Sequence, residues 1–357
     1  MLINETENNL LIALAGDKRN DEIEALISRD IDWQYFVRLA RTHYVTTLIY
    51  RNLRPWSDQV PNEVLHALEH RAKKSAFRNL RFAAELKDLG KVLEGNGIGF
   101  LSYKGPTLSK LAYGDSGFRN FVDLDLFIRK SDFPKIKSVI LENGGDNAWN
   151  LTEKQEEAVI EYYYEHPFWF GKRPVMVEVH WAFMESFFGF DFEQEDLFGR
   201  SQTVSVQGTD FPTLSNEDLL IVLCVHGSKH YWKRLSWISD IAMLSRSQPI
   251  DWDIVLRRAR KFGSLRMVSL GMFLANDMFQ IEMPVEVQRQ VEKDKKIAVL
   301  AEALKNEIFN GADSAESVRS RIHLMMRERW RDKFKYSQRL FRTKLIDSIF
   351  MPMGRPT

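Results

Sequence analysis

The spacing of apolar residues changes twice along this chain, and the change sets the order of its parts. Up to about residue 95 apolar residues recur at three- and four-residue steps, which indicates amphipathic helices, the longest running from Asn62 toward Leu93. Residues 96–214 hold short apolar runs that alternate with helical stretches, which indicates an α/β segment. From residue 215 the spacing is helical again. We therefore expect three parts, 1–95, 96–214 and 215–357.

Composition excludes several classes of protein. The chain of 357 residues has a formal charge of +1, so no strong overall field attracts nucleic acid. Its single cysteine, Cys224, excludes an internal disulfide and a cysteine-based zinc cluster. The chain contains no stretch of about 18 apolar residues, which argues against a membrane span. The N-terminus lacks the pattern of a secretory signal, so we expect a cytoplasmic protein.

Carboxylates stand on one face of two predicted strands. In FVDLDLFI the alternation of side chains places Asp123 and Asp125 together, opposite the apolar positions. In VMVEVHW it places Glu178 and His180 together. Two such strands in one sheet would bring three carboxylates together, an arrangement that binds one or two Mg²⁺ ions. Paired metal ions suit in-line phosphoryl displacement.

Cationic and flexible residues flank these strands. Lys104 and Gly105 lie where a strand turns into a helix, a place where a cation and backbone N–H groups can receive phosphate. Arg119 offers a planar fork for phosphate just before the acidic strand. The alternative is structural, with Asp123 or Asp125 paired to Arg119 or Arg129 at a strand end.

Further candidates lie toward the C-terminus. His226, Lys229 and His230 are candidates for a cleft opposite the carboxylates, where they would contact nucleotide or acceptor. Packing and helix capping are the alternative, and the absence of an H-E-x-x-H pattern argues against zinc. His180 either joins the cleft or packs under the sheet. The segment from Arg319 to Lys344 is basic, which predicts a packed helix with a solvated face or, alternatively, a surface for an anionic partner.

These residues together resemble a known family. The pattern resembles the uncharacterised nucleotidyltransferase family of the DNA polymerase β-like superfamily over most of the chain, through Lys104-Gly105, Tyr113, Arg119, Asp123-x-Asp125 and Glu178-Val-His180-Trp181. The resemblance implies an α+β fold, with a small mixed β-sheet nucleotidyltransferase-like core flanked by N- and C-terminal helical lobes. The wider superfamily usually has Gly-Ser at the first turn, where this chain has Lys104-Gly105-Pro106.

The resemblance also implies an activity. Carboxylates at Asp123, Asp125 and Glu178 would bind Mg²⁺, with Mn²⁺ as the alternative, and Lys104, Gly105 and Arg119 would hold the phosphates. The metal would position a nucleoside triphosphate such as ATP for transfer of its nucleoside monophosphate to an acceptor, with release of pyrophosphate. The third carboxylate would help to activate the acceptor hydroxyl.

Three questions stay open at the level of sequence. The acceptor could be a small molecule, a sugar, a peptide or a protein, and neither the nucleotide nor the oligomeric state is readable. A non-catalytic nucleotide- or partner-binding protein with a degenerate metal site is the alternative function. A metal-dependent phosphohydrolase would also use such carboxylates and would release inorganic phosphate.

Overall fold

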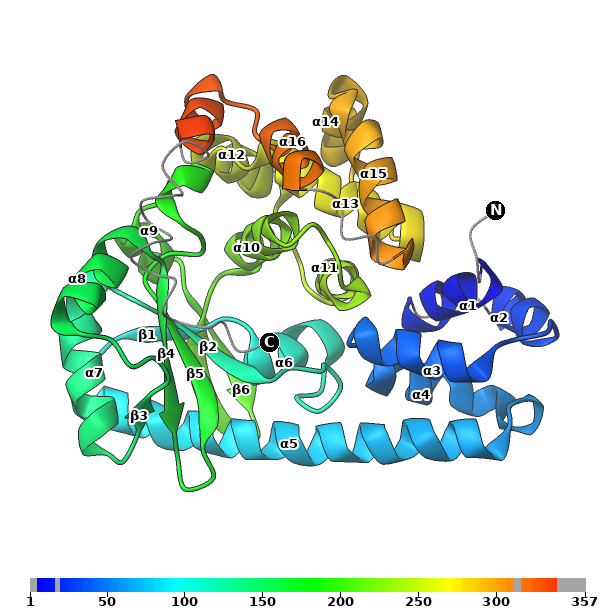
Figure 1. The fold of residues 1–357 in the computed structure, drawn as a ribbon, viewed down its shortest axis with the longest axis horizontal. Coiled ribbons are helices and arrows are strands. Elements are labelled where there is room, and N and C mark those ends of the chain that lie inside the picture. The colour runs from blue at the N-terminus through cyan, green and yellow to red at the C-terminus, as the bar shows by residue number, and fades with distance from the viewer. Residues whose placement is uncertain (1–4, 17–19, 311–315, 339–357) are drawn as a thin grey trace.

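The long helix α5 (Asn62–Gly95) connects the two sides of the molecule. The structure is a computed structural model that describes residues 5–16, 20–310 and 316–338. In Figure 1, α5 passes beneath the β-sheet at one end and beneath the N-terminal helices at the other. The predicted helix from Asn62 toward Leu93 is confirmed.

Helices make up the N-terminal part of the chain. The order is α1 (Glu5–Ala15), α2 (Asn20–Ile27), α3 (Trp33–Thr42), α4 (Thr46–Leu53), a 3₁₀ helix η1 (Arg54–Gln59) and α5. Asp32 starts α3 because its side chain accepts a hydrogen bond from the Tyr35 N–H at 2.8 Å. The turn between α3 and α4 carries Tyr44, which lines the cavity described below.

A mixed sheet forms the centre of the chain. Its strands lie in the order β1 (Phe100–Ser102), β2 (Asp123–Ile128), β5 (Val175–His180), β4 (Glu165–Phe170) and β3 (Asp146–Asn147). Strands β2 and β5 are parallel, and the other neighbouring pairs are antiparallel. The expected α+β fold with a small mixed sheet is therefore confirmed.

The connections of this central part are helices and one hairpin. They are α6 (Gly105–Tyr113), η2 (Lys130–Asp132), α7 (Phe133–Glu142), α8 (Glu153–Tyr162), η3 (Ser186–Phe188), α9 (Gln194–Gly199) and the hairpin of β6 (Gln202–Val206) and β7 (Thr209–Thr213). Gln207 and Gly208 form the hairpin turn with φ values of 52° and 74°, the left-handed conformation that a two-residue turn favours.

The C-terminal part is helical again. It contains α10 (Asn216–Lys229), α11 (Leu235–Ser247), α12 (Trp252–Phe262), α13 (Leu265–Phe279), α14 (Val285–Lys293), α15 (Lys296–Asn310) and α16 (Glu316–Met326). Helix α11 packs against α6 and α13 (Figure 1). The predicted basic helix is interrupted, because α16 ends at Met326 and residues 330–338 form a separate helical segment. Arg327, between them, is buried, and the part of this segment beyond residue 338 lies outside the described residues.

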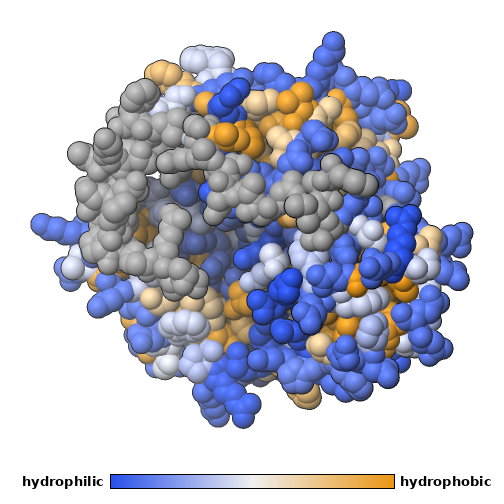
Figure 2. All heavy atoms as spheres, turned by 45° about the vertical axis from the view of Figure 1, so that its right-hand side comes forward, coloured by the Kyte–Doolittle hydropathy of each residue, from blue (hydrophilic) through white to orange (hydrophobic). Residues whose placement is uncertain are grey.

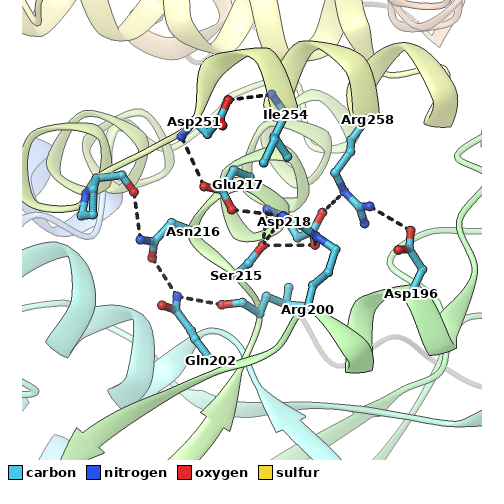
Figure 3. Close-up of polar contacts among 12 residues, drawn as sticks. Asp196, Arg200, Gln202, Ser215, Asn216, Glu217, Asp218, Asp251, Ile254 and Arg258 are labelled. Atoms are coloured by element: carbon cyan, nitrogen blue, oxygen red, sulfur yellow. Dashed lines mark hydrogen bonds and ion pairs between the residues drawn. The ribbon is translucent and has the colours of Figure 1, made fainter.

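Buried charges fix the start of α10, the helix that carries three candidate residues (Figure 3). Asp218 accepts hydrogen bonds from Arg258 Nε at 2.5 Å and from Arg200 Nε at 3.2 Å. Arg258 also reaches Asp196 at 2.8 Å, and Ser215 caps the helix by accepting from the Asp218 N–H. Since buried carboxylates are costly unless paired, this network holds α9, α10 and α12 in one arrangement.

One continuous cluster of buried apolar side chains extends through the N-terminal helices, the sheet and the C-terminal helices. The expected division into 1–95, 96–214 and 215–357 stays a prediction. On the face drawn in Figure 2, hydrophilic residues predominate, with apolar patches between them. Within the described ranges, none of the helices combines the length and the apolar character that a membrane span requires.

Candidate active site

The predicted carboxylates meet across the parallel strands β2 and β5. Asp125 and Glu178 are register partners, and the alternation of β2 places Asp123 on the same face as Asp125. The opposite face of β2 carries Leu124 and Leu126, which are fully buried. Apolar packing on one face therefore fixes the acids on the other.

His180 joins this group. Its Nε2 lies 3.4 Å from Asp125 Oδ1 and 3.5 Å from Glu178 Oε2, while its Nδ1 lies 3.2 Å from Glu165 Oε2. Burial lowers the pKa of His180, but attraction to Glu165, Asp125 and Glu178 outweighs burial and raises it to about 9. His180 therefore lies among carboxylates that favour its protonated form, and it does not pack under the sheet away from them.

Lys104 reaches the same carboxylates from the turn after β1. Its Nζ donates a hydrogen bond to Asp125 Oδ1 over 2.8 Å, and both side chains are buried. Burial of Asp125 opposes ionisation, but Lys104 and His180 hold the pKa of this carboxyl well below its usual range. Burial, with the charges of Asp125 and Glu178, raises the pKa of Asp123 to about 7. Burial and the two neighbouring acids thus oppose ionisation of Asp123.

Gly105 allows the turn that places Lys104. Its φ is 52°, and a Cβ at this position would lie 3.3 Å from the Asp123 carbonyl oxygen. Thr107 braces the same turn by donating to the Lys104 carbonyl oxygen at 2.7 Å. A side chain at position 105 would separate the start of α6 from β2.

Arg119 has a partner that was not predicted. Its Nε lies 2.9 and 3.0 Å from the two carboxylate oxygens of Asp240, and Tyr113 Oη donates to Asp240 Oδ1 at 2.9 Å. Arg119 therefore does not offer its whole fork to phosphate, although it lines the cavity. The pairing of Asp123 or Asp125 with Arg119 or Arg129 is also wrong, because Arg129 pairs with Glu195.

The C-terminal part supplies the opposite wall of the cavity. His226 and Lys229 of α10 line it, as does His230, which caps the C-terminus of this helix, and their candidate role requires this. Burial lowers the pKa of both histidines, that of His230 to about 3, so both rings are neutral. Lys229 Nζ lies 3.4 Å from Glu185 Oε2 and 3.5 Å from the centre of the Tyr164 ring.

Sequence reasoning missed two acidic residues of this site, Glu165 and Glu185. Glu165 and Tyr164 line the cavity, whose volume is about 270 Å³, and Glu185 pairs with Lys229 behind it. A charged residue within the aromatic run of residues 162–170 is the signal that would have identified Glu165.

A group of potential metal ligands converges here. In the part of the chain that the structure describes, ligand atoms of Asp125, Glu178 and His180 all lie within 4.8 Å of one another. The histidines of α10 belong to no such group among these residues, which gives no support to a zinc site there. Asp123 stands beside the group on the same strand face and outside the set that converges.

The sequence of this chain also matches a known protein family. A sequence model of the uncharacterised nucleotidyltransferase family matches residues 29–280. The chain belongs to this family. The match includes every candidate residue of the cavity from Lys104 to His230, so the family resemblance expected from the motifs is confirmed.

Other comparisons add little to the family assignment. No curated protein matches the chain. A solved structure that resembles this nucleotidyltransferase-family chain is that of the antibiotic-resistance factor ANT(2'')-Ia. The TM-score is 0.38 and the identity 11%, over 52% of this chain and 92% of that chain.

Proposed function

We propose that this protein is a Mg²⁺-dependent nucleotidyltransferase that moves a nucleoside monophosphate from a nucleoside triphosphate to an acceptor and releases pyrophosphate. The main observation in favour of this proposal is that Asp125 and Glu178 lie side by side on neighbouring parallel strands. Lys104 lines the cavity at the same place. Mn²⁺ is the alternative ion. We retain the cytoplasm as the proposed location because the chain has a single cysteine.

The residues fit a divalent cation. Asp125 Oδ2 is buried and has no hydrogen-bond partner among the described residues, although Lys104 and His180 occupy the other oxygen. Such an atom needs a positive partner, and Mg²⁺ prefers carboxylate oxygen and water. Asp123, Asp125 and Glu178 would hold the ion, which would neutralise triphosphate charge and position the reacting oxygens.

The remaining residues would act on the triphosphate. Lys104 and the N-terminal backbone of α6 would bind phosphate oxygens, helped by the Nη groups of Arg119. These cations would stabilise the charge that grows on the leaving pyrophosphate. When protonated, His180 would balance part of the charge of the neighbouring acids.

The proposed transfer has a simple balance of bonds. An acceptor oxygen forms a bond to the α-phosphorus while the bond from that phosphorus to the bridging oxygen breaks. Pyrophosphate leaves with the electron pair, and the proton of the acceptor hydroxyl passes to Glu178. Chemistry of this kind depends on position and charge more than on covalent participation of the protein.

Thermal shift measurements with non-hydrolysable ATP, GTP, CTP and UTP analogues, with and without Mg²⁺, test this proposal. We expect stabilisation by at least one analogue only when Mg²⁺ is present, and its loss in Glu178→Gln. Lys87→Gln, an exposed change on α5, is the control and should behave like the wild type. Equal stabilisation of the Glu178→Gln variant would refute the role of the carboxylates.

The Lys104–Asp125 ion pair favours a second candidate, a non-catalytic nucleotide-binding protein. In such a protein Lys104 and His180 would neutralise Asp125 permanently, and nucleotide would bind equally well without Mg²⁺. A phosphohydrolase would release inorganic phosphate from the triphosphate, which a phosphate assay separates from pyrophosphate release.

A further inference from the structure

A second cavity adjoins the carboxylate cavity. Its volume is about 670 Å³, which falls within the roughly 300–1,000 Å³ usual for small-molecule sites. The two cavities share part of their lining, namely Tyr44, Asn120, Val122 and Arg234. A molecule in the second cavity would therefore lie beside the residues that precede Asp123 in the chain.

Positive charge predominates in this second cavity. Its charged lining residues are Arg41, Arg78, Lys233, Arg234 and Glu307. The Nε of Arg78 is buried and has no hydrogen-bond partner among the described residues. Burial also lowers the pKa of Arg78, although the charge of Asp123 opposes this shift. An anion would satisfy the Nε of Arg78 and balance the excess of positive charge in the lining.

The shared wall is built from segments that lie far apart in the chain. Tyr44 has a φ of 59°, which is unfavourable for a non-glycine residue, and the guanidinium of Arg234 lies 4.0 Å from the centre of its ring. His43 holds this geometry: its Nδ1 accepts from the Leu235 N–H at 3.2 Å, and its carbonyl oxygen accepts from the Ser236 N–H at 3.2 Å. Strain that the surroundings maintain in this way is common at binding sites.

Asn120 places a donor on the same wall. Its Oδ1 accepts from Thr47 Oγ1 and from Ser75 Oγ, each at 2.8 Å. The amide oxygen is thus committed to the protein, and the Nδ2 group is left as the donor for the cavities that Asn120 lines. A neutral donor beside arginines suits a phosphate oxygen.

We propose that the second cavity is the acceptor subsite and that the acceptor is a small molecule carrying a phosphate group. This inference rests on the proposed function, since it assigns the triphosphate to the first cavity with Lys104 and the N-terminus of α6. Three guanidinium groups and a lysine match a phosphate dianion better than a singly charged carboxylate. With its phosphate held there, the acceptor would present its hydroxyl across the shared wall to the carboxylates.

Calorimetric titration with inorganic phosphate tests the subsite. We expect saturable binding that weakens about tenfold in Arg41→Gln/Lys233→Gln, because two charged donors are lost. The control Lys87→Gln/Lys91→Gln removes the same charge from exposed positions of α5 outside both cavities and should bind phosphate as the wild type does. Arg41→Gln alone changes an exposed side chain and keeps the test readable if the double variant fails to fold.

Competition separates this inference from the proposed function. Phosphate should still bind when a non-hydrolysable nucleotide and Mg²⁺ saturate the first cavity, and the Arg41→Gln/Lys233→Gln variant should bind that nucleotide normally. Displacement of phosphate by nucleotide, or phosphate binding that both double variants share equally, would overturn the acceptor subsite. A wild-type protein that binds phosphate but no Mg²⁺–nucleotide would instead refute the nucleotidyltransferase proposal.

Discussion

Lys104 Nζ lies 2.8 Å from Asp125 Oδ1 and joins the β1–α6 turn to the middle of β2. Their side chains are 11% and 2% exposed, so the pair is removed from water. A residue expected to bind phosphate thus contacts a residue expected to hold a metal ion. The phosphate and the metal ion would therefore bind next to each other at this pair. A change that removes the charge of Lys104 or of Asp125 would also affect the ligand of the other residue.

Asp125→Asn should abolish Mg²⁺-dependent nucleotide binding and also destabilise the protein. The substitution leaves the buried Lys104 without its counter-charge, a change that costs about 3–5 kcal/mol in comparable buried pairs. Chemical denaturation measures the loss. The double variant Lys104→Met/Asp125→Asn should recover most of the stability and none of the binding. Recovery of binding in the double variant would show that Asp125 does not hold the ion.

Gly105→Ala should cost more stability than Gly97→Ala. Both glycines have a positive φ, 52° and 66°, so alanine strains the backbone at each by about 1 kcal/mol. A Cβ at Gly105 would also press on the Asp123 carbonyl oxygen at 3.3 Å, whereas a Cβ at Gly97 meets nothing within 4 Å. Thermal unfolding of the two variants isolates the contact with β2. Equal losses would mean that α6 shifts freely away from the sheet.

Side-chain alternation explains what the sequence could predict. Two strands with period-two apolar faces define which acids share a face, and this pattern alone is enough to group Asp123 with Asp125 and Glu178 with His180. Helical spacing likewise predicts α5, because a long apolar stripe is a strong signal. These features depend on residues close together in the chain.

The missing features depend on contacts between distant residues. Asp240 pairs with Arg119 across 121 positions, and no local pattern indicates which of several cations an aspartate will meet. Strand β4 was not predicted because Pro167 and a run of aromatic residues obscure its alternation. Glu165 was missed for the same reason. The second cavity has no sequence signal, since α3, α5, the α10–α11 turn and α15 all contribute to its wall.

Arg119→Ala should destabilise the protein far more than Arg129→Ala. The first change leaves Asp240, which is fully buried, without its cation, at a cost of about 3–5 kcal/mol. The second breaks a solvent-exposed pair with Glu195, and its effect should be slight. Urea denaturation compares the two. A small effect of Arg119→Ala would show that the ion pair between Arg119 and Asp240 contributes little to the free energy of unfolding.

A related variant separates structure from phosphate binding at Arg119. Asp240→Asn keeps a hydrogen-bonding partner of similar shape and frees the guanidinium charge. If Arg119 also binds the triphosphate through its Nη groups, Mg²⁺–nucleotide affinity should rise or stay unchanged in this variant. A loss of affinity in a folded Asp240→Asn protein would assign a positioning role to the ion pair.

His43 should make the protein less stable in mild acid. Burial lowers its pKa to about 4 from an ordinary value of 6.5, because the protein interior disfavours the charged ring. Between pH 6.5 and 4 the unfolded chain therefore binds a proton that the folded chain does not, and stability falls as the pH falls through this window. At pH 5 the contribution of this residue is roughly 2 kcal/mol.

The variant His43→Asn tests this contribution, since the asparagine Oδ1 can replace Nδ1 as the acceptor for the Leu235 N–H. Urea denaturation at several pH values should show a shallower decline between pH 6.5 and 5 than in the wild type. His66→Asn, which alters an exposed histidine of α5, should keep the wild-type decline. Identical slopes for the wild type and His43→Asn would contradict the buried, neutral state of His43. They would also argue against the hydrogen bond from the Leu235 N–H to His43 Nδ1, which joins the α3–α4 turn to α11 at the shared wall of the two cavities.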